Sequence, residues 1–238
     1  MPFNFQTFKT RALTALLFVA VMLVGLLWNF WSFVVLFTVI HFGCWYEFVK
    51  LLKKIYGSKY LPYCLGGVIY ITLPVLMMLD WAREVTVIQN VNIPTSTIFD
   101  RIIPIGIIFS IWVNDTMAYL VGSFIGRTPL SKISPKKTWE GTIGGVVLCV
   151  IVIGFLYPLV VSATTGINIR SSQWFIIPAL CAIFGTIGDL FESKLKRMAE
   201  VKDSGSFMPG HGGFLDRFDS LLFAVPAVWV YVYFFLDY

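Results

Sequence analysis

Long apolar runs are the feature that most constrains the fold of this chain. They lie at about 12–28, 30–49, 61–79, 102–124, 142–162, 174–192 and 219–236. Each reaches or approaches the roughly 20 apolar residues that a helix needs to cross a bilayer. Only 13% of the residues are charged, against about 25% in a typical soluble domain. The sequence therefore predicts an all-α, polytopic transmembrane helical bundle of about seven spans, and the short alternating segments of a membrane barrel are absent.

The basic residues predict an orientation for these spans. Fifteen of the 18 Lys and Arg residues fall on one side if the N-terminus is cytoplasmic, and only Arg83, Arg101 and Arg170 fall on the other. Loops with excess Lys and Arg stay in the cytoplasm. We therefore expect a cytoplasmic N-terminus, an external C-terminus and two cytoplasmic loops, 125–141 and 193–218. The first run follows basic residues, as a signal peptide does, but it lacks a small-residue cleavage site, so we expect it to be retained.

We expect residues 1–100 to form N-terminal transmembrane helices and residues 101–238 to form a catalytic core that carries both loops.

Composition also limits the classes of partner. The net charge of +5 suits anionic lipid, and no basic helix stands free of the membrane, so nucleic acid is not expected as a partner. The four cysteines have no metal-ligand spacing and are predicted to pack in the interior.

The stretch from Gly188 to Ser220 is a long polar segment between two strongly apolar ones, and it holds six of the 13 acids in the chain. Asp189 ends one predicted helix and Asp216 begins the next, so a helical hairpin can bring both carboxylates to one hard cation. Asp219 and Ser220 fit either that site or a helix cap. The alternative for the whole stretch is a solvated loop whose charges pair with one another.

A second polar feature lies inside the fourth apolar run. Asp115, Tyr119, Gly122 and Gly126 recur at helical spacing and share one helix face. An acid inside the membrane is costly and usually functional, although a hydrogen-bonded acid that only locks helices together would give the same pattern. The two glycines have the GxxxG spacing that lets another helix approach closely.

Two further features suit phosphate. Lys136 and Lys137 follow a Ser-Pro turn and precede the start of a helix, where phosphate groups bind readily. Lysines at a cytoplasmic boundary can also act only as topology determinants. His211 lies among glycines that would let backbone N–H groups approach phosphate, and a simple turn histidine is the alternative.

These segments together resemble the signature of the phosphatidate cytidylyltransferase (CDP-diacylglycerol synthase) family. The resemblance covers roughly Asn114 to Ser220. It rests on the run from Ser193 through Pro209-Gly210-His211-Gly212-Gly213 to Asp219, on the Ser134–Gly141 block, and on the segment around Asn114 and Asp115. The first hundred residues match only in being apolar.

The resemblance implies transfer of a cytidylyl group from CTP to phosphatidic acid, which gives CDP-diacylglycerol and pyrophosphate. It also implies Mg2+, an association with a monovalent cation such as K+, and a homodimer. The family's metal-binding acids match Asp189 and Asp216, with Asp219 as a further candidate. The catalytic candidates are Asp189, Asp216, Lys202, Asp203 and His211. The substrate-binding candidates are Lys136, Lys137, Ser193, Lys194, Lys196, Arg197, Arg217, Asp115 and Tyr119.

The nucleophile in this reaction would be the lipid phosphate, which is already anionic, so alignment and relief of charge repulsion are needed rather than a strong base. We expect a multi-pass protein of the bacterial cytoplasmic membrane whose site faces the cytoplasm. A CTP-dependent polyprenol or phytol kinase is the enzymatic alternative, with His211 or Asp203 as general base. A cation-coupled transporter would instead use Asp115 and Asp189 as cation sites, but no internal repeat supports it. A structural scaffold would leave the acid clusters unexplained.

Overall fold

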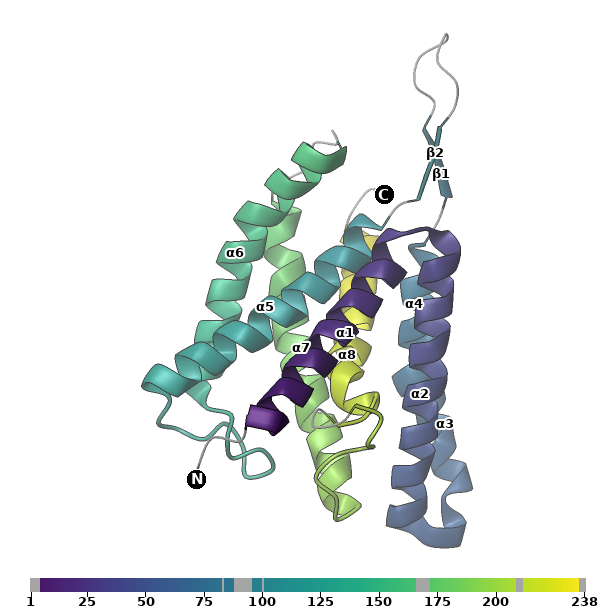
Figure 1. Ribbon diagram of the computed structural model, residues 1–238, viewed down its shortest axis with the longest axis vertical. Helices are drawn as coiled ribbons and strands as arrows, with labels where there is room; N and C mark the ends of the chain where they lie inside the picture. Colours follow the sequence, from purple (N-terminus) through teal and green to yellow (C-terminus); the bar gives the residue numbers. More distant parts are fainter. Residues whose placement is uncertain are drawn as a thin grey trace. The chain divides into compact units, whose positions relative to one another are not determined.

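The computed structural model of the protein describes residues 5–82, 84–87, 96–99, 101–165, 172–208 and 212–235. Within these ranges every secondary-structure element is a helix apart from one pair of short strands, and loops join the helices (Figure 1). The longer helices are α1 (Phe5–Leu27), α2 (Phe30–Tyr56), α5 (Ile102–Ile125), α6 (Trp139–Thr165), α7 (Gln173–Met198) and α8 (Leu215–Phe235). The shorter elements are η1 (Gly57–Lys59), η2 (Leu61–Tyr63), α3 (Cys64–Gly67), η3 (Val68–Thr72), α4 (Leu73–Asp80), β1 (Glu84–Val87) and β2 (Ser96–Phe99).

The predicted all-α membrane architecture is confirmed. Among the described residues, six helical segments are long and apolar enough to cross a membrane: Phe30–Lys59, Leu61–Asp80, Ile102–Ile125, Trp139–Thr165, Gln173–Met198 and Leu215–Phe235. The first expected span corresponds to α1, whose apolar part, Ala12–Leu27, is shorter than the other six. The count is thus close to the expected seven, and the orientation of the N-terminus stays a prediction.

The span expected at 61–79 is not one regular helix. It consists of a 3₁₀ turn, a short α-helix, a π-helical turn at Val68–Thr72 and then α4. Pro74 has no N–H to donate to an earlier carbonyl, and a proline within a helical segment is a common cause of such a break in the regular ladder. The segment between the apolar runs 61–79 and 102–124 contains the antiparallel pair β1–β2, in which Glu84 is opposite Phe99.

Several helices extend past their expected ends. α2 continues through Lys50, Lys53 and Lys54 to Tyr56, beyond the apolar run 30–49. Lysines in the last turn of a helix are favoured by the helix dipole, so the charges extend the helix instead of ending it. At the other end, Asn29 accepts a hydrogen bond from the Ser32 backbone N–H at 2.7 Å and completes a capping box, which starts α2 directly after the end of α1.

The chain forms two compact units. The first consists of residues 1–101 and 198–218, and the second of residues 102–197 and 219–238. The predicted division assigned the catalytic core to residues 101–238. The two units are defined by contacts and do not test that assignment, which stays a prediction. Helix α8 begins in the first unit and continues in the second.

In the first unit, α1 and α2 form a hairpin, and α2 also packs against α3 and α4 (Figure 1). Its core includes Leu26, Phe33, Phe37 and Ile71, all nearly inaccessible to solvent. The Arg101 guanidinium donates to the backbone carbonyls of Leu26, at 3.3 Å, and Leu27. These carbonyls lack intrahelical partners at the end of α1, so Arg101 caps that helix.

In the second unit, α5 crosses α6 along a seam of small residues (Figure 1). A Cβ atom at Gly145 would lie 2.7 Å from the Cβ of Ala118, and one at Gly141 would lie 2.9 Å from the Cα of Gly122. The GxxxG spacing therefore does mark a close helix approach, as predicted. Helix α7 packs against α8 in the same manner, because Gly188 lies against the Asp219 backbone.

Candidate active site

The loop that joins α5 to α6 is tightly folded. The Leu130 N–H donates to the Lys137 carbonyl at 2.7 Å, and the Trp139 N–H donates to the Thr128 carbonyl at 2.9 Å. The Glu140 carboxylate accepts hydrogen bonds from the backbone N–H groups of Arg127 and Thr128, at 3.2 Å each. The two ends of the loop are thereby joined to each other and to the first turn of α6, and this fixes the backbone position of Lys137.

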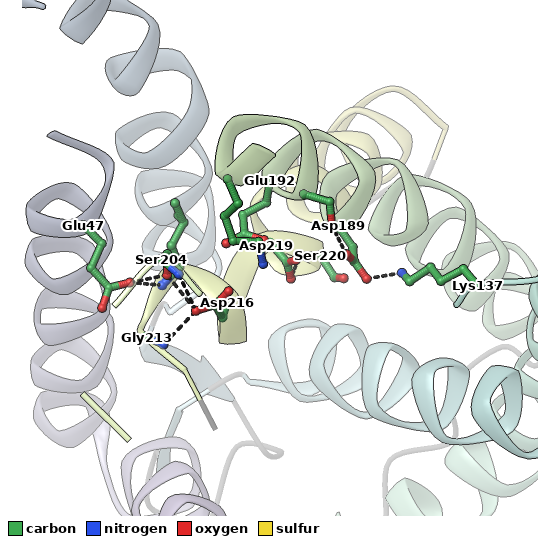
Figure 2. A network of polar contacts seen from close by, with 12 residues as sticks. Glu47, Lys137, Asp189, Glu192, Ser204, Gly213, Asp216, Asp219 and Ser220 are labelled. Carbon is green, nitrogen blue, oxygen red and sulfur yellow. Dashed lines mark hydrogen bonds and ion pairs between the residues drawn. The ribbon is translucent and has the colours of Figure 1, made fainter. Parts of the chain in front are cut away.

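Lys137 forms an ion pair with Asp189 of α7, and Figure 2 shows the two side chains pointing toward each other. Both side chains are partly exposed, at 31% for Lys137 and 27% for Asp189. The Ser193 hydroxyl, one turn further along α7, donates to Asp189 Oδ1 at 3.2 Å. Thus a residue predicted to hold phosphate lies beside a residue predicted to hold metal, although the two are 52 positions apart in sequence.

Two further acids of the second unit are buried. Glu192 is fully buried and forms an ion pair with Lys196, one turn along α7. Asp219 is 8% exposed, and its Oδ1 accepts a hydrogen bond from the Ser220 N–H at 2.6 Å. Asp219 also lies within electrostatic range of Asp189, Lys137 and Asp115.

The position of α8 tests one of the two interpretations of Asp219 and Ser220, the helix cap. The helix begins at Leu215, four residues before the expected start of the span at 219. Asp219 and Ser220 therefore lie in the second turn, and the prediction that they cap the helix is wrong. Asp216, in the first turn, is the residue whose negative charge complements the dipole at the N-terminus.

The Asp216 carboxylate is oriented by the loop before α8. Its Oδ2 accepts hydrogen bonds from the Ser204 N–H at 2.9 Å, from the Ser204 hydroxyl at 2.9 Å and from the Gly213 N–H at 2.8 Å. The loop is closed by a bridge between Met208 and Gly212. Gly212 has φ of 85°, and a Cβ atom there would lie 2.6 Å from Asp216 Oδ2, so this position favours glycine.

Sequence reasoning missed Glu47. This α2 residue is 3% exposed, and its carboxylate accepts a hydrogen bond from the Ser204 hydroxyl (Figure 2). It also accepts from the backbone N–H groups of Phe214 and Leu215. The signal that could have found it is its place as the single acid of the apolar run 30–49. The same signal drew attention to Asp115.

The other candidates are more dispersed. Asp115 and Tyr119 are exposed on α5, where Tyr119 is 74% exposed. His211 lies outside the described residues. Asp189 and Asp216 belong to different units, and their joint metal site stays a prediction. The remaining charged candidates all have exposed side chains: Lys136, Lys194, Arg197, Lys202, Asp203 and Arg217.

The fold and these contacts define an integral membrane protein of the all-α class that carries acids and lysines at the ends of its helices. Such a combination suits a site that handles a charged, phosphate-bearing molecule next to a lipid bilayer.

Comparison with known proteins identifies the family. Residues 85–235 match the cytidylyltransferase family, and the chain belongs to that family. Three relatives are named as phosphatidate cytidylyltransferases. The protein of Thermotoga maritima is 48% identical over 126 residues, which cover 52% of this chain and 46% of the relative. The protein of Bacillus subtilis is 44% identical over 120 residues, which cover 50% of this chain and 43% of the relative.

The third relative is phosphatidate cytidylyltransferase 4, chloroplastic, of Arabidopsis thaliana. It is 47% identical over 120 residues, which cover 50% of this chain and 29% of the relative. The chain thus spans about half the length, or less, of the curated relatives that it matches.

Proposed function

We propose that this protein transfers the cytidylyl group of CTP to phosphatidic acid and so forms CDP-diacylglycerol and pyrophosphate for phospholipid synthesis. The observation that carries the proposal is the ion pair between Lys137 and Asp189. It joins the basic loop 125–141 to the acid-bearing end of α7, in a chain that belongs to the cytidylyltransferase family. A reaction between two polyanions requires positive charge beside the phosphates, and the basic loop and the metal that acids can bind would both supply it.

The chemistry balances without a general base. A phosphate oxygen of the lipid attacks the α-phosphorus of CTP, and a new P–O bond forms. The bond from that phosphorus to the oxygen that bridges to the β-phosphate breaks, and pyrophosphate leaves with the electron pair. The exposed cations Lys194, Arg197, Lys202 and Arg217 would hold the phosphates and reduce the repulsion between them.

We further propose that Asp189 and Asp216 hold the catalytic Mg2+. The residues fit a hard cation: both are carboxylates, and hydrogen bonds from Ser193 and Ser204 orient them. The described residues contain no group of three or more His, Cys, Asp or Glu side chains placed to hold a metal. Mg2+ is commonly held by one or two carboxylates together with substrate phosphates and water, so two protein ligands are sufficient. Bound Mg2+ would neutralise charge on the phosphates.

The remaining parts of the proposal concern the assembly and its place in the cell. We propose a homodimer, a second, monovalent cation such as K+, and a location in a bacterial cytoplasmic membrane with the site facing the cytoplasm. The excess of Lys and Arg in loops 125–141 and 193–218 supports the orientation. Cross-linking in intact membranes would test the dimer, and activity in K+ against N-methylglucamine buffers would test the second cation.

Labelled CTP tests the central reaction. Membranes containing the protein are supplied with phosphatidic acid, Mg2+ and CTP that carries the label in either the α- or the γ-phosphate. We expect the α-label to appear in lipid and the γ-label in pyrophosphate. Transfer of the γ-label to an added polyprenol or phytol would show a lipid kinase instead, and label in neither lipid would reject both enzymes.

A further inference from the structure

The buried carboxylate of Glu47 contacts a segment far from it in sequence. Its Oε2 accepts hydrogen bonds from the Ser204 hydroxyl at 2.6 Å and from the Leu215 N–H at 2.9 Å. Its Oε1 accepts one from the Phe214 N–H at 3.0 Å. All four residues belong to the first compact unit. Helix α2 is thereby tied to both ends of the loop that precedes α8.

These contacts supply a cap that the local sequence lacks. The first N–H groups of a helix have no partner within the helix, and a Ser, Thr, Asp or Asn just before the helix usually accepts from them. Here the residue before Leu215 is Phe214, which has no polar side chain. Glu47 accepts from this end of α8 in its place, and its negative charge also complements the helix dipole.

Glu47 and Asp216 share the same piece of backbone. The Gly213 N–H donates to Asp216 Oδ2, whereas the next two N–H groups, of Phe214 and Leu215, donate to Glu47. The Ser204 hydroxyl lies within hydrogen-bonding distance of both carboxylates, at 2.6 Å from Glu47 and 2.9 Å from Asp216. Since this hydroxyl has one proton to donate, a displacement of either carboxylate would leave that proton to the other.

The backbone approaches the Glu47 carboxylate closely at two glycines. A Cβ atom at either Gly205 or Gly213 would overlap Oε1 of Glu47. Backbone on both sides of the loop thus packs directly against this carboxylate. Such close packing restricts the Glu47 side chain more than an exposed ion pair would, because the surrounding atoms leave little room for other rotamers.

We propose that Glu47 is a positioning residue for Asp216: it fixes the first turn of α8 and, through Ser204, the orientation of the Asp216 carboxylate. The inference rests on the proposed function in that Asp216 is a metal ligand there. Partners that orient a metal-ligating carboxylate typically contribute about 10- to 100-fold to metal affinity or activity. Glu47 would thus link the N-terminal helices to the chemistry of the C-terminal half.

The test variant is Glu47→Gln, which preserves size but replaces one acceptor oxygen with an NH2 group. Oε1 and Oε2 each accept from a backbone N–H. Either orientation of the amide therefore places its NH2 group against a backbone N–H, and two donors face each other. Hydrogen exchange of the full chain is followed in peptides covering 199–207 and 212–218. We expect faster exchange in both peptides, because Ser204 and Gly213 donate to Asp216 while Phe214 and Leu215 donate to Glu47.

The second measurement is the Mg2+ concentration that gives half the maximal rate of CDP-diacylglycerol formation. We expect Glu47→Gln to raise it about 10-fold, the lower end of the effects of such partners, and to change the rate at saturating Mg2+ much less. A residue that only supports the fold would lower the amount of active protein and leave this concentration unchanged.

Glu140→Gln is the matched control for exchange. Glu140 also accepts from two backbone N–H groups, but in the second unit, so its effect should be confined to loop 125–141 and leave exchange at 199–207 and 212–218 unchanged. If Glu47→Gln fails to fold, Ser204→Ala removes only the bridging hydroxyl. It should raise the Mg2+ requirement and speed exchange at 199–207, with less effect on Phe214 and Leu215.

Unchanged exchange at 199–207 in the folded variants would overturn the proposal, as would an unchanged Mg2+ requirement. If the wild-type protein makes no CDP-diacylglycerol, the proposed function fails, and the exchange of the two peptides alone decides whether Glu47 positions Asp216. The two failures are therefore distinguishable.

Discussion

Asp189 already contacts a cation, the Lys137 ammonium group, and a residue so placed is tested best by a neutral replacement of the same shape. We expect Asp189→Asn and Asp216→Asn each to lower CDP-diacylglycerol formation by about 100-fold or more, since a ligand should matter at least as much as the partners that orient one. If both hold one ion, the double variant should cost little more than either single variant.

The measurement is product formed from labelled CTP at increasing Mg2+ for both single variants and the double. The folded protein should survive Asp189→Asn, because a partly exposed ion pair contributes only about 0–1 kcal/mol. Near-normal activity of Asp189→Asn at ordinary Mg2+ would reject the joint site. The metal would then be sought at Asp203, Asp219 or Asp115.

The two lysines of loop 125–141 differ in ways that the sequence does not reveal. Lys137 is half-buried against Asp189, whereas Lys136 is exposed. Both are proposed to contact substrate phosphate, so Lys136→Gln and Lys137→Gln should each raise KM for CTP or for the lipid. Only Lys137→Gln should also lower kcat, since its ammonium group lies next to a proposed metal ligand.

Steady-state kinetics with each substrate varied in turn would separate these effects. A well-folded Lys136→Gln variant with unchanged constants would reduce Lys136 to a topology determinant. Equal losses of kcat in both variants would contradict the distinction drawn from the ion pair.

At the scale of single residues, the sequence was sufficient to select candidate residues but not to predict their contacts. Residue types and spacing were sufficient to select Asp189 and Lys137 as candidates, because charged residues in or beside a membrane are costly and often functional. Spacing could not show that these two meet, because the contact depends on how loop 125–141 folds back on Glu140. Glu47 was missed because its partners are mostly backbone N–H groups, which no side-chain pattern reveals.

At the scale of helices, the glycine seam between α5 and α6 determines where loop 125–141 lies. A Cβ atom at Gly145 would meet both the Cβ and the backbone of Ala118, at 2.7 and 3.0 Å. Backbone cannot yield as a flexible side chain can, so we expect Gly145→Ala to separate the helices and lower stability by about 1–3 kcal/mol, as overpacking usually does.

Gly66→Ala is the control, because a Cβ atom at Gly66 meets nothing within 4 Å. Thermal unfolding in detergent should show a lower midpoint for Gly145→Ala and no loss for Gly66→Ala. Activity should fall with Gly145→Ala as well, since the seam carries loop 125–141. A Gly145→Ala protein with the wild-type midpoint would show that α5 and α6 can separate at no cost.

Helix existence was predictable and helix boundaries were less so. Apolar length gave the spans, since an uninterrupted run has few alternatives in a membrane. The ends shifted because polar residues continue a helix when its dipole or a distant partner favours them. The lysines of α2 extend its C-terminal end, and Glu47 supports a start of α8 at Leu215.

At the scale of the whole molecule, the distribution of Lys and Arg predicts which ends of the helices face the cytoplasm. Positive charge is retained there, and CTP is a cytoplasmic solute that cannot cross the hydrocarbon core, so the proposed reaction requires loops 125–141 and 193–218 on that side. Two exposed serines report on the two faces: Ser206 in loop 193–218, and Ser172 between the apolar runs 142–162 and 174–192, on the same expected external side as Arg170.

Cysteine labelling of intact cells tests this orientation. Ser206→Cys and Ser172→Cys are placed singly in a Cys64→Ala background, because the other three native cysteines, Cys44, Cys149 and Cys181, are buried. An impermeant maleimide added outside should label residue 172 and not residue 206, and permeabilisation should expose residue 206. Labelling of residue 206 alone from outside would invert the topology, and the polar site would then face away from the proposed nucleotide substrate.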